Sequence, residues 1–210
     1  IDKKKCHNID LLISDNLPEI ALLNKNVFLY ANFFWHEIFQ KQNNFFKNLK
    51  KIIIKKKTKI ISNYLFGNIK SFKKNVYRIG FIGKYKKSNN LKKRGILIST
   101  GTSNIGYKSI AKNLYKTIAN KKFRNYKFYV DKKLIVNQKL LPSNIKVADF
   151  SQNMYKQIKV ALIKPGFGTI HDCVERGIPM ISFKKKMNYE FSHNGKIINK
   201  YNLGIISYDF

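Results

Sequence analysis

The 210-residue sequence has few of the residues that mark disulfide-bonded, zinc-binding or membrane-spanning proteins. Its two cysteines, Cys6 and Cys173, lie far apart, and neither has the Cys-x-x-Cys or Cys/His spacing of a structural zinc site. No apolar run approaches the roughly 20 residues of a membrane-spanning helix, and the first residues do not follow the pattern of a signal peptide. We therefore expect a protein of the reducing cytoplasm.

Acidic residues are also scarce, since 11 Asp and Glu stand against 42 Lys and Arg, for a formal net charge of +31. Such an excess predicts anionic partners, among them nucleic acid, nucleotide phosphates and acidic membrane surfaces. Only four of the basic residues are arginine, at positions 78, 94, 124 and 176. Specific nucleic-acid readers rely on arginine for bidentate contacts with guanine, so a nucleic-acid-binding protein is the weaker alternative.

The apolar residues are sufficient for a buried core, because 44% of the sequence is hydrophobic and 14% is aromatic. Short β-branched runs alternate with amphipathic stretches, which is typical of parallel sheets covered by helices. Strands are expected over residues 9–15 and 26–31, and helices over residues 17–23 and 33–48. Residues 50–93 lose this periodicity and carry clusters of lysine, which predicts a connection between two domains.

A second alternating series begins at Gly95 and predicts a doubly wound α/β domain. The expected strands are residues 96–99, 126–130, 145–148, 160–163, 178–183 and 204–207, and the expected helices are residues 106–120, 152–157, 169–176 and 190–200. The predicted fold class is therefore α/β, with two Rossmann-like doubly wound domains over residues 1–82 and 83–210.

A first glycine-containing loop follows the strand expected at residues 96–99. Gly101, Thr102 and Ser103 are small or hydroxyl-bearing residues at the point where a strand should turn into a helix. Such residues allow close approach of a phosphate and donate hydrogen bonds to it. The spacing matches neither the Rossmann GxGxxG nor the P-loop pattern, so an ordinary strand-to-helix turn is an equal alternative.

A second loop, with Gly166 and Gly168, follows the strand expected at residues 160–163. Thr169 is predicted to be the N-cap of the next helix, and Asp172, three residues later, completes a pattern like a capping box. The positive end of that helix suits a diphosphate, and an acidic side chain there can accept hydrogen bonds from ribose hydroxyls. The alternative for Asp172 is a purely local role as partner of the N-cap.

The residues from Lys164 onward resemble the nucleotide-sugar half of GT-B glycosyltransferases, especially the lipid II-forming N-acetylglucosaminyltransferase of peptidoglycan synthesis and its relatives. That family has a glycine loop, a threonine, an acidic residue, Gly-x-Pro on the next strand, and a polar pair that opens another helix. The matching residues are Gly166, Gly168, Thr169, Asp172, Gly177, Pro179, Glu190 and Asn194. Residues 95–104 are similar to the first loop of the same domain, and residues 14–15 and 32–35 to the acceptor-side domain, whose start would lie upstream. The resemblance thus implies a GT-B fold with an incomplete N-terminal domain.

The resemblance implies transfer of a sugar from a nucleoside diphosphate, with UDP expected, to a glycan or lipid-linked acceptor of the cell envelope or a polysaccharide. The nucleotide-sugar would be a substrate, no cofactor is expected, and transfer would proceed by direct displacement with inversion. The sequence contains no Asp-x-Asp pair, so a metal-independent mechanism is expected. The implied ligands of the diphosphate are Gly101, Thr102, Ser103, Gly166, Gly168 and Thr169, helped by Lys164, with Asp172 for the ribose and Glu190 and Asn194 for the sugar.

The sequence departs from the family pattern at two positions of the donor site. Asp172 is shorter than the glutamate usual in the family, and Phe191 stands where a glutamine commonly binds the sugar. Asp15 and His36 are the N-terminal candidates for the catalytic base, which in this family often lies in the upstream part. Their alternatives are a helix cap for Asp15 and a packing role for His36.

Three further alternatives follow from the same residues. A nucleotide-sugar hydrolase or epimerase would use the same donor site without an acceptor, and a non-catalytic donor-binding subunit would have the same fold.

The lysine-rich, aromatic stretch from Phe45 to Lys57 predicts contact with anionic lipid and a peripheral position on the inner face of the membrane. A solvated helix face is the alternative for that stretch.

Overall fold

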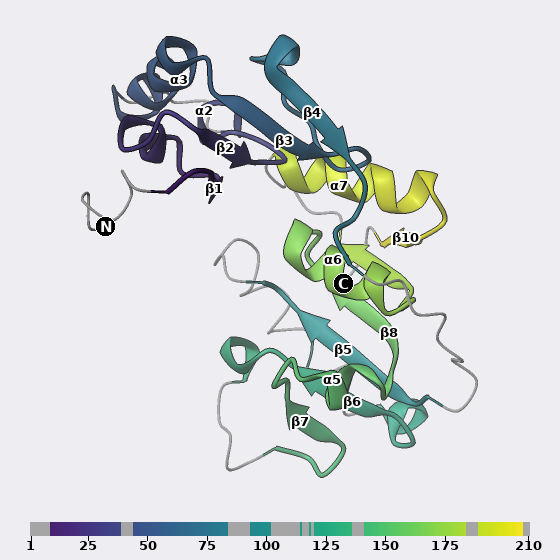
Figure 1. The fold of residues 1–210 in the computed structure, drawn as a ribbon. Coiled ribbons are helices and arrows are strands. Elements are labelled where there is room, and N and C mark those ends of the chain that lie inside the picture. Colours follow the sequence, from purple (N-terminus) through teal and green to yellow (C-terminus); the bar gives the residue numbers. More distant parts are fainter. Residues whose placement is uncertain are drawn as a thin grey trace. The chain divides into compact units, whose positions relative to one another are not determined.

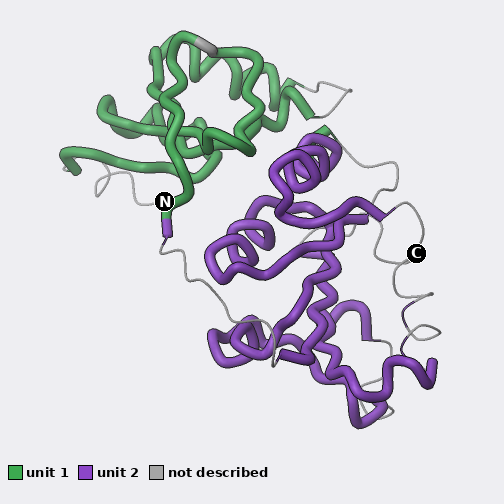
Figure 2. The backbone as a smooth tube through the Cα atoms, turned by 90° about the vertical axis from the view of Figure 1, so that its right-hand side faces the viewer, with its two compact units in different colours: residues 1–82, 188–190 green, residues 83–187, 191–210 purple. Residues whose placement is uncertain are grey.

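The computed structural model describes residues 9–38, 44–83, 93–101, 114, 118, 120–135, 141–183 and 189–207 (Figure 1). The chain divides into two compact units (Figure 2). Unit 1 comprises residues 1–82 and 188–190, and unit 2 comprises residues 83–187 and 191–210. No helix in the described ranges is both long and apolar enough to cross a membrane.

Unit 1 contains a parallel sheet of four strands in the order β1-β2-β3-β4 (Figure 1). The strands are β1 (Leu12–Asp15), β2 (Val27–Tyr30), β3 (Lys59–Asn63) and β4 (Val76–Ile79), and the helices are η1 (Pro18–Leu22), α2 (Trp35–Ile38), α3 (Asn44–Lys56) and η2 (Lys73–Asn75). These strands follow one another in chain order, so the described part of unit 1 does not show the reversal of strand order that defines a doubly wound sheet.

Helix α3 corrects two predictions from the sequence. Within the expected helix over residues 33–48, residues 35–38 form α2 and residues 44–48 belong to α3, which continues to Lys56. Leu49 and Ile53, four residues apart, are buried on one face of α3, and Ile53 joins the unit 1 core with Leu29 and Ile60. The connection predicted from residue 50 is therefore wrong at its start, because α3, β3 and β4 all belong to unit 1.

Unit 2 contains a parallel sheet of six strands in the order β10-β9-β8-β5-β6-β7. The strands are β5 (Gly95–Ser99), β6 (Lys127–Val130), β7 (Ile145–Val147), β8 (Ile158–Ile163), β9 (Met180–Phe183) and β10 (Gly204–Ser207), and the helices are η3 (Lys121–Phe123), η4 (Lys132–Leu134), α5 (Gln152–Tyr155), α6 (Phe167–Glu175) and α7 (Tyr189–Lys200). All five residues of β5 are buried, as expected for a central strand covered on both faces. The helix predicted over residues 106–120 lies largely outside the described residues, but Leu114 and Ile118 are helical and pack in the unit 2 core.

The order of the unit 2 strands places a reversal between β5 and β8. Numbered along the chain within the unit, the order is 3-2-1-4-5-6, which is that of doubly wound dinucleotide-binding domains. Ser99 at the end of β5 pairs with Ile163 at the end of β8, and the Lys164 N–H donates to the Ser99 carbonyl at 3.1 Å. Because ligands of such sheets bind outside the carboxyl ends of the strands at the reversal, the fold brings both glycine loops to that position.

Candidate functional site

The loop after β5 turns at Gly101, which has a φ of +64°. Glycine adopts this left-handed conformation without the steric penalty that a Cβ would impose. The Gly101 N–H donates to Ser99 Oγ at 3.3 Å, and Lys133 Nζ donates to the Gly101 carbonyl. Thr100, between Ser99 and Gly101, is fully buried. Thr102 and Ser103, the other predicted ligands of this loop, lie outside the described residues.

The loop after β8 begins helix α6 earlier than the sequence predicts. Gly166, not Thr169, is the N-cap, with an extended backbone and no side-chain cap, and Phe167 is the first helical residue. Gly168 and Thr169 are therefore inside the first turn, where backbone N–H groups have no partner within the helix. These groups and the positive end of the helix can bind a diphosphate without a capping side chain in the way.

Lys164 lies between the two loops and is only 3% exposed. Its Nζ is 5.1 Å from the centroid of the Phe191 ring, and a Cβ built on Gly101 would lie 3.9 Å from its Cε. The side chain thus extends from the end of β8 toward the end of β5. Together with Lys133, which also reaches Gly101, it places two positive charges at the carboxyl edge of the sheet. This arrangement favours a multiply charged anion there.

Two residues of helix α7 contact the second loop. The Asn194 amide, which is buried, donates to the Pro165 carbonyl at 2.9 Å. A Cβ built on Gly166 would lie 3.9 Å from Cε1 of Phe191, so this ring packs against the loop. Asn194, predicted to bind the sugar, therefore holds the loop in place through its side-chain nitrogen. Glu190 lies in the first turn of α7 and belongs to unit 1.

Asp172, predicted to bind the ribose, lies in the middle of α6 and has two side-chain partners. Tyr155 donates to its Oδ2 at 3.1 Å, and Arg176 pairs with its Oδ1 at 3.2 Å. Burial and the Asp172 charge raise the pKa of Tyr155 far above its usual range, so the phenol stays protonated and remains a donor. The Asp172 side chain is still 41% exposed, and carboxylate oxygens have further lone pairs to offer to ribose hydroxyls.

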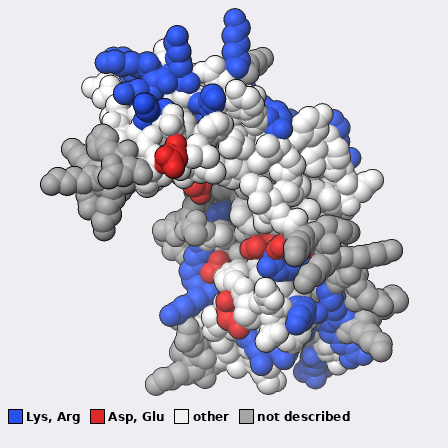
Figure 3. Space-filling view, in the orientation of Figure 1, with Lys and Arg blue, Asp and Glu red and all other residues white. Residues whose placement is uncertain are grey.

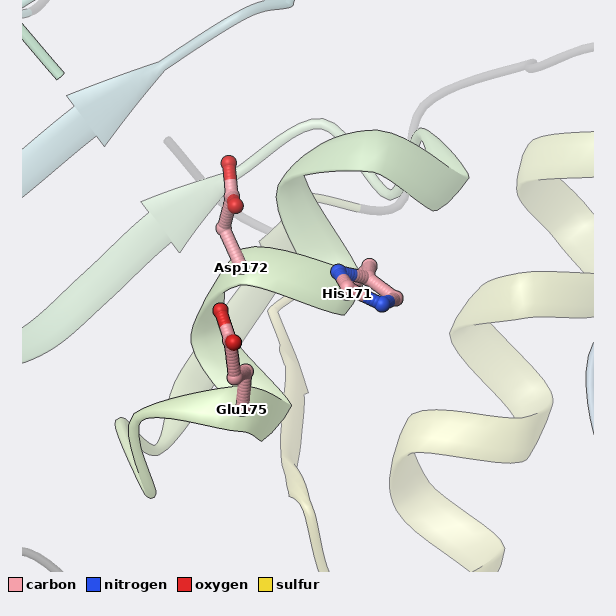
Figure 4. Close-up of side chains that lie close together, drawn as sticks. All are labelled: His171, Asp172 and Glu175. Carbon is pink, nitrogen blue, oxygen red and sulfur yellow. The ribbon is translucent and has the colours of Figure 1, made fainter. Parts of the chain in front are cut away.

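Figure 4 shows the one group of potential metal ligands found among the described residues, His171, Asp172 and Glu175 of α6. One ligand atom from each lies within 4.8 Å of the others. The two carboxylates are already paired with a cation, because Arg176 lies 3.2 Å from Asp172 Oδ1 and 2.8 Å from Glu175 Oε2. Arg176 thus offsets part of the negative charge of this group within α6.

The contacts of Asp172 predict that Asp172→Ala lowers the stability of the chain more than Tyr155→Phe does. Asp172→Ala leaves the hydroxyl of the buried Tyr155 without its acceptor, which costs roughly 1–3 kcal/mol of unfolding free energy. Tyr155→Phe removes the donor and leaves a partly exposed carboxylate, which costs about 0.5–1.5 kcal/mol. Urea unfolding of both variants measures this difference. Equal stability of Asp172→Ala and the parent chain would contradict the structural role of this contact.

The two candidate bases of the N-terminal part lie in different environments. His36 is buried, stacks on Phe34 with centroids 5.6 Å apart, and has Nε2 3.4 Å from Ser71 Oγ. Burial lowers its pKa, which favours the neutral imidazole, and the surroundings favour a packing role. Asp15 is exposed at the carboxyl end of β1. The 3-10 helix η1 begins after Leu17 without a side-chain cap, so Asp15 does not cap it.

Two residues of this site were missed by reasoning from the sequence. Lys133 follows β6, the neighbour of β5, and the only local signal is a polar segment after an apolar strand. Tyr155 is 17 residues from Asp172 along the chain, and α5 brings it to α6. Neither contact could be predicted without the strand order.

No protein-family model matches the sequence, and no curated protein is significantly similar to it. The fold is similar to several solved structures of glycosyltransferases. The glycotransferase of kitacinnamycin has a TM-score of 0.61 at 12% identity, with 95% of this chain and 63% of that chain covered. The calicheamicin glycosyltransferase CalG4 has a TM-score of 0.53 at 13% identity, with 94% of this chain and 62% of that chain covered.

A third similar structure is MurG of Acinetobacter baumannii, with a TM-score of 0.53 at 11% identity and with 90% of this chain and 61% of that chain covered. The chain thus spans somewhat over three-fifths of the length of these three structures. Identities this low establish the fold and not the reaction. Together with the parallel sheets of the two units, they confirm the predicted architecture, and the chain has the fold of GT-B glycosyltransferases over the part that it spans.

Proposed function

We propose that the chain is the donor-binding part of a glycosyltransferase that takes a sugar from a nucleoside diphosphate. One observation carries the proposal: the glycine loops after β5 and β8 lie together at the reversal of strand order in unit 2, with the buried Lys164 between them. A solved structure with a TM-score of 0.54, the spinosyn rhamnosyltransferase SpnG, is a complex with thymidine diphosphate, which supports a nucleoside diphosphate as the ligand.

In the proposed mechanism, unit 2 stabilises the leaving nucleoside diphosphate. The N–H groups of the first turn of α6 and the Lys164 ammonium face the negative charge that develops as the bond to the anomeric carbon breaks. An acceptor hydroxyl attacks that carbon from the opposite side, with inversion. Asp15 is the candidate to take the proton of this hydroxyl, since its carboxylate is exposed. UDP as donor nucleotide and a glycan or lipid-linked acceptor of the cell envelope complete the proposal.

Calorimetric titration of the chain with UDP, GDP, dTDP and a mixed oligonucleotide, at low and moderate salt, tests the donor site. We expect saturable binding of one nucleoside diphosphate that persists at moderate salt, whereas binding driven by charge alone falls steeply with salt. Asp172→Asn, which keeps an acceptor for Tyr155, should weaken binding, and the matched change Asp149→Asn at an exposed acid of unit 2 should not. No nucleotide preference, with oligonucleotide binding that disappears as salt rises, would contradict the proposal.

An assay with the preferred nucleotide-sugar then separates transfer from hydrolysis. Release of free sugar at full rate without any acceptor would identify a hydrolase of the same fold. Conversion of the nucleotide-sugar into its epimer would identify an epimerase. We expect neither reaction to match the rate of transfer to a suitable acceptor.

A further inference from the structure

Lys164 differs from the other basic residues of the chain in its burial. Figure 3 shows many Lys and Arg side chains on the surface of each unit, with few Asp and Glu among them. Among the Lys and Arg residues that the structure describes, Lys164 is the one that is buried. Exposed lysines are hydrated and flexible, whereas a buried ammonium group loses its hydration and requires partners inside the protein. The neighbours of this side chain therefore determine whether its charge is available to a ligand.

The backbone of Lys164 is fixed on both sides. Its N–H donates to the Ser99 carbonyl at 3.1 Å, and its carbonyl accepts from the Gly166 N–H at 2.7 Å. The second bond closes a three-residue turn around Pro165, whose ring restricts φ to a value close to the one that such a turn requires. The Pro165 carbonyl accepts from the Asn194 side chain at 2.9 Å. The turn thus fixes the Cα of Lys164, but a flexible four-carbon chain still separates that atom from the ammonium group.

Phe191 restricts the rest of the Lys164 side chain. The Lys164 Nζ lies 5.1 Å from the centroid of the Phe191 ring, within the range of a cation–π interaction. Both residues are buried, and such an interaction is stronger when the two groups are desolvated. Residues three apart lie on one face of a helix, so Phe191 and Asn194 of α7 reach the same turn. Asn194 contacts the backbone of the turn, and Phe191 contacts the Lys164 side chain.

A phenyl ring attracts a lysine without neutralising it. A carboxylate in the same place would add a negative charge that repels phosphate, and it would accept hydrogen bonds from the ammonium group. The ring instead attracts the cation through its quadrupole and carries no net charge. Phe191 can therefore hold the ammonium group in place without reducing its attraction for an anion.

We propose that Phe191 is a positioning residue of the diphosphate site, which holds the Lys164 ammonium group between the two glycine loops for the ligand. A Cβ built on Gly101 would lie 3.9 Å from Cε of Lys164, and one built on Gly166 would lie 3.9 Å from Cε1 of Phe191. The ring thus packs against one loop, and the lysine that it holds extends to the other. This role rests on the proposed function, because it concerns the ligand of Lys164, and it requires no contact between Phe191 and the donor sugar.

Ring fluorination tests the proposal with little change in the shape of the side chain. Fluorine withdraws electron density from the ring face and weakens its attraction for a cation. Phe191 would be replaced with phenylalanine that carries one, two or three ring fluorines, and each chain titrated with whichever of UDP, GDP and dTDP the parent chain binds most tightly. We expect the affinity to fall stepwise, by roughly 5- to 30-fold over the series. The same series at Phe128, which is 3% exposed in the unit 2 core, should leave the affinity unchanged.

A double-variant cycle separates the effect on Lys164 from a loss of packing. Phe191→Leu keeps an apolar side chain but removes the ring, and it should weaken nucleotide binding by roughly 5- to 30-fold in the parent chain. In the Lys164→Met background the same change should weaken binding by at most about twofold, because the residue through which Phe191 acts is absent. A purely structural role of the ring would give equal losses in both backgrounds.

The outcomes distinguish this role of Phe191 from the donor site as a whole. Suppose that the parent chain binds a nucleoside diphosphate and that Lys164→Met weakens this binding. An affinity that stays constant or rises with fluorination, or equal losses from Phe191→Leu in the two backgrounds, would then overturn the role of Phe191 and leave the donor site intact. No saturable binding by the parent chain would contradict the donor site itself and this role with it.

Discussion

Replacing Lys164 with methionine is expected to weaken binding of the preferred nucleoside diphosphate by about 10- to 100-fold. Hydrogen bonds that involve a charged group contribute about 1.5–3 kcal/mol, and Lys164 is the buried cation between the two glycine loops. Methionine fills a similar volume, so the loop and the Phe191 contact should persist. Calorimetric titration gives the affinity, and urea unfolding shows whether the domain keeps its stability.

The matched control for this variant is Lys159→Met. Lys159 is on β8, the strand that Lys164 follows, and it is exposed near the amino end of that strand. The two variants have the same net charge, so a difference between them reports position and not overall attraction. Equal affinities of Lys164→Met and Lys159→Met would exclude Lys164 from the diphosphate site.

Gly168→Ala should weaken binding of the nucleoside diphosphate without lowering the stability of the chain. No described atom lies within 4 Å of a Cβ built at Gly168, and the residue is helical, so alanine should preserve or raise stability by up to about 1 kcal/mol. The same methyl group would occupy the space through which a diphosphate approaches the first turn of α6. We expect the affinity for the nucleoside diphosphate to fall by about tenfold or more, since roughly 1.4 kcal/mol corresponds to a factor of ten.

Gly80→Ala is the corresponding control, because a Cβ built at Gly80 also meets no described atom within 4 Å, and Gly80 belongs to unit 1. It should change neither the affinity nor the thermal midpoint by more than the error of measurement. Unchanged nucleotide affinity in Gly168→Ala would mean that the ligand does not approach the N-terminus of α6.

The central strands of unit 2 could be predicted from the sequence because they are short apolar runs that end in polar turns. The start of α6 could not. Thr169 is a good N-cap by residue type, but a cap contributes only about 1 kcal/mol. Pro165 and Gly166 follow the extended segment, and the helix begins at Phe167 and buries Ile170 and Cys173. Local preference was outweighed by packing.

In α3 the residue types favour a strand, although the segment forms a helix. Ile52, Ile53 and Ile54 are β-branched and suggest a strand or an irregular connection by residue type. In the structure Ile53 packs one helical turn after Leu49, while Ile54 is exposed. Distinguishing a buried helix from a strand in such a short run requires the partner surface, which η1 and β2 provide.

The predicted ligands also show what sequence reasoning omits. The spacing of Asp172 and Asn194 matched the family pattern, but spacing does not reveal the hydrogen bonds that each side chain makes inside the fold. Tyr155 and Arg176 bind Asp172, and the Pro165 carbonyl accepts from Asn194. Both side chains therefore help to position the second glycine loop or its helix.

The most direct test of the donor site is a residue-resolved map of nucleotide binding. We would record amide ¹H–¹⁵N spectra of the chain during titration with UDP, and with the nucleoside diphosphate preferred in calorimetry if it differs. We expect saturable shifts of the Gly101, Gly166, Phe167 and Gly168 amides, at the carboxyl ends of β5 and β8. Shifts confined to the lysines of α3, or none at the two loops under saturating nucleotide, would contradict a donor site at these loops.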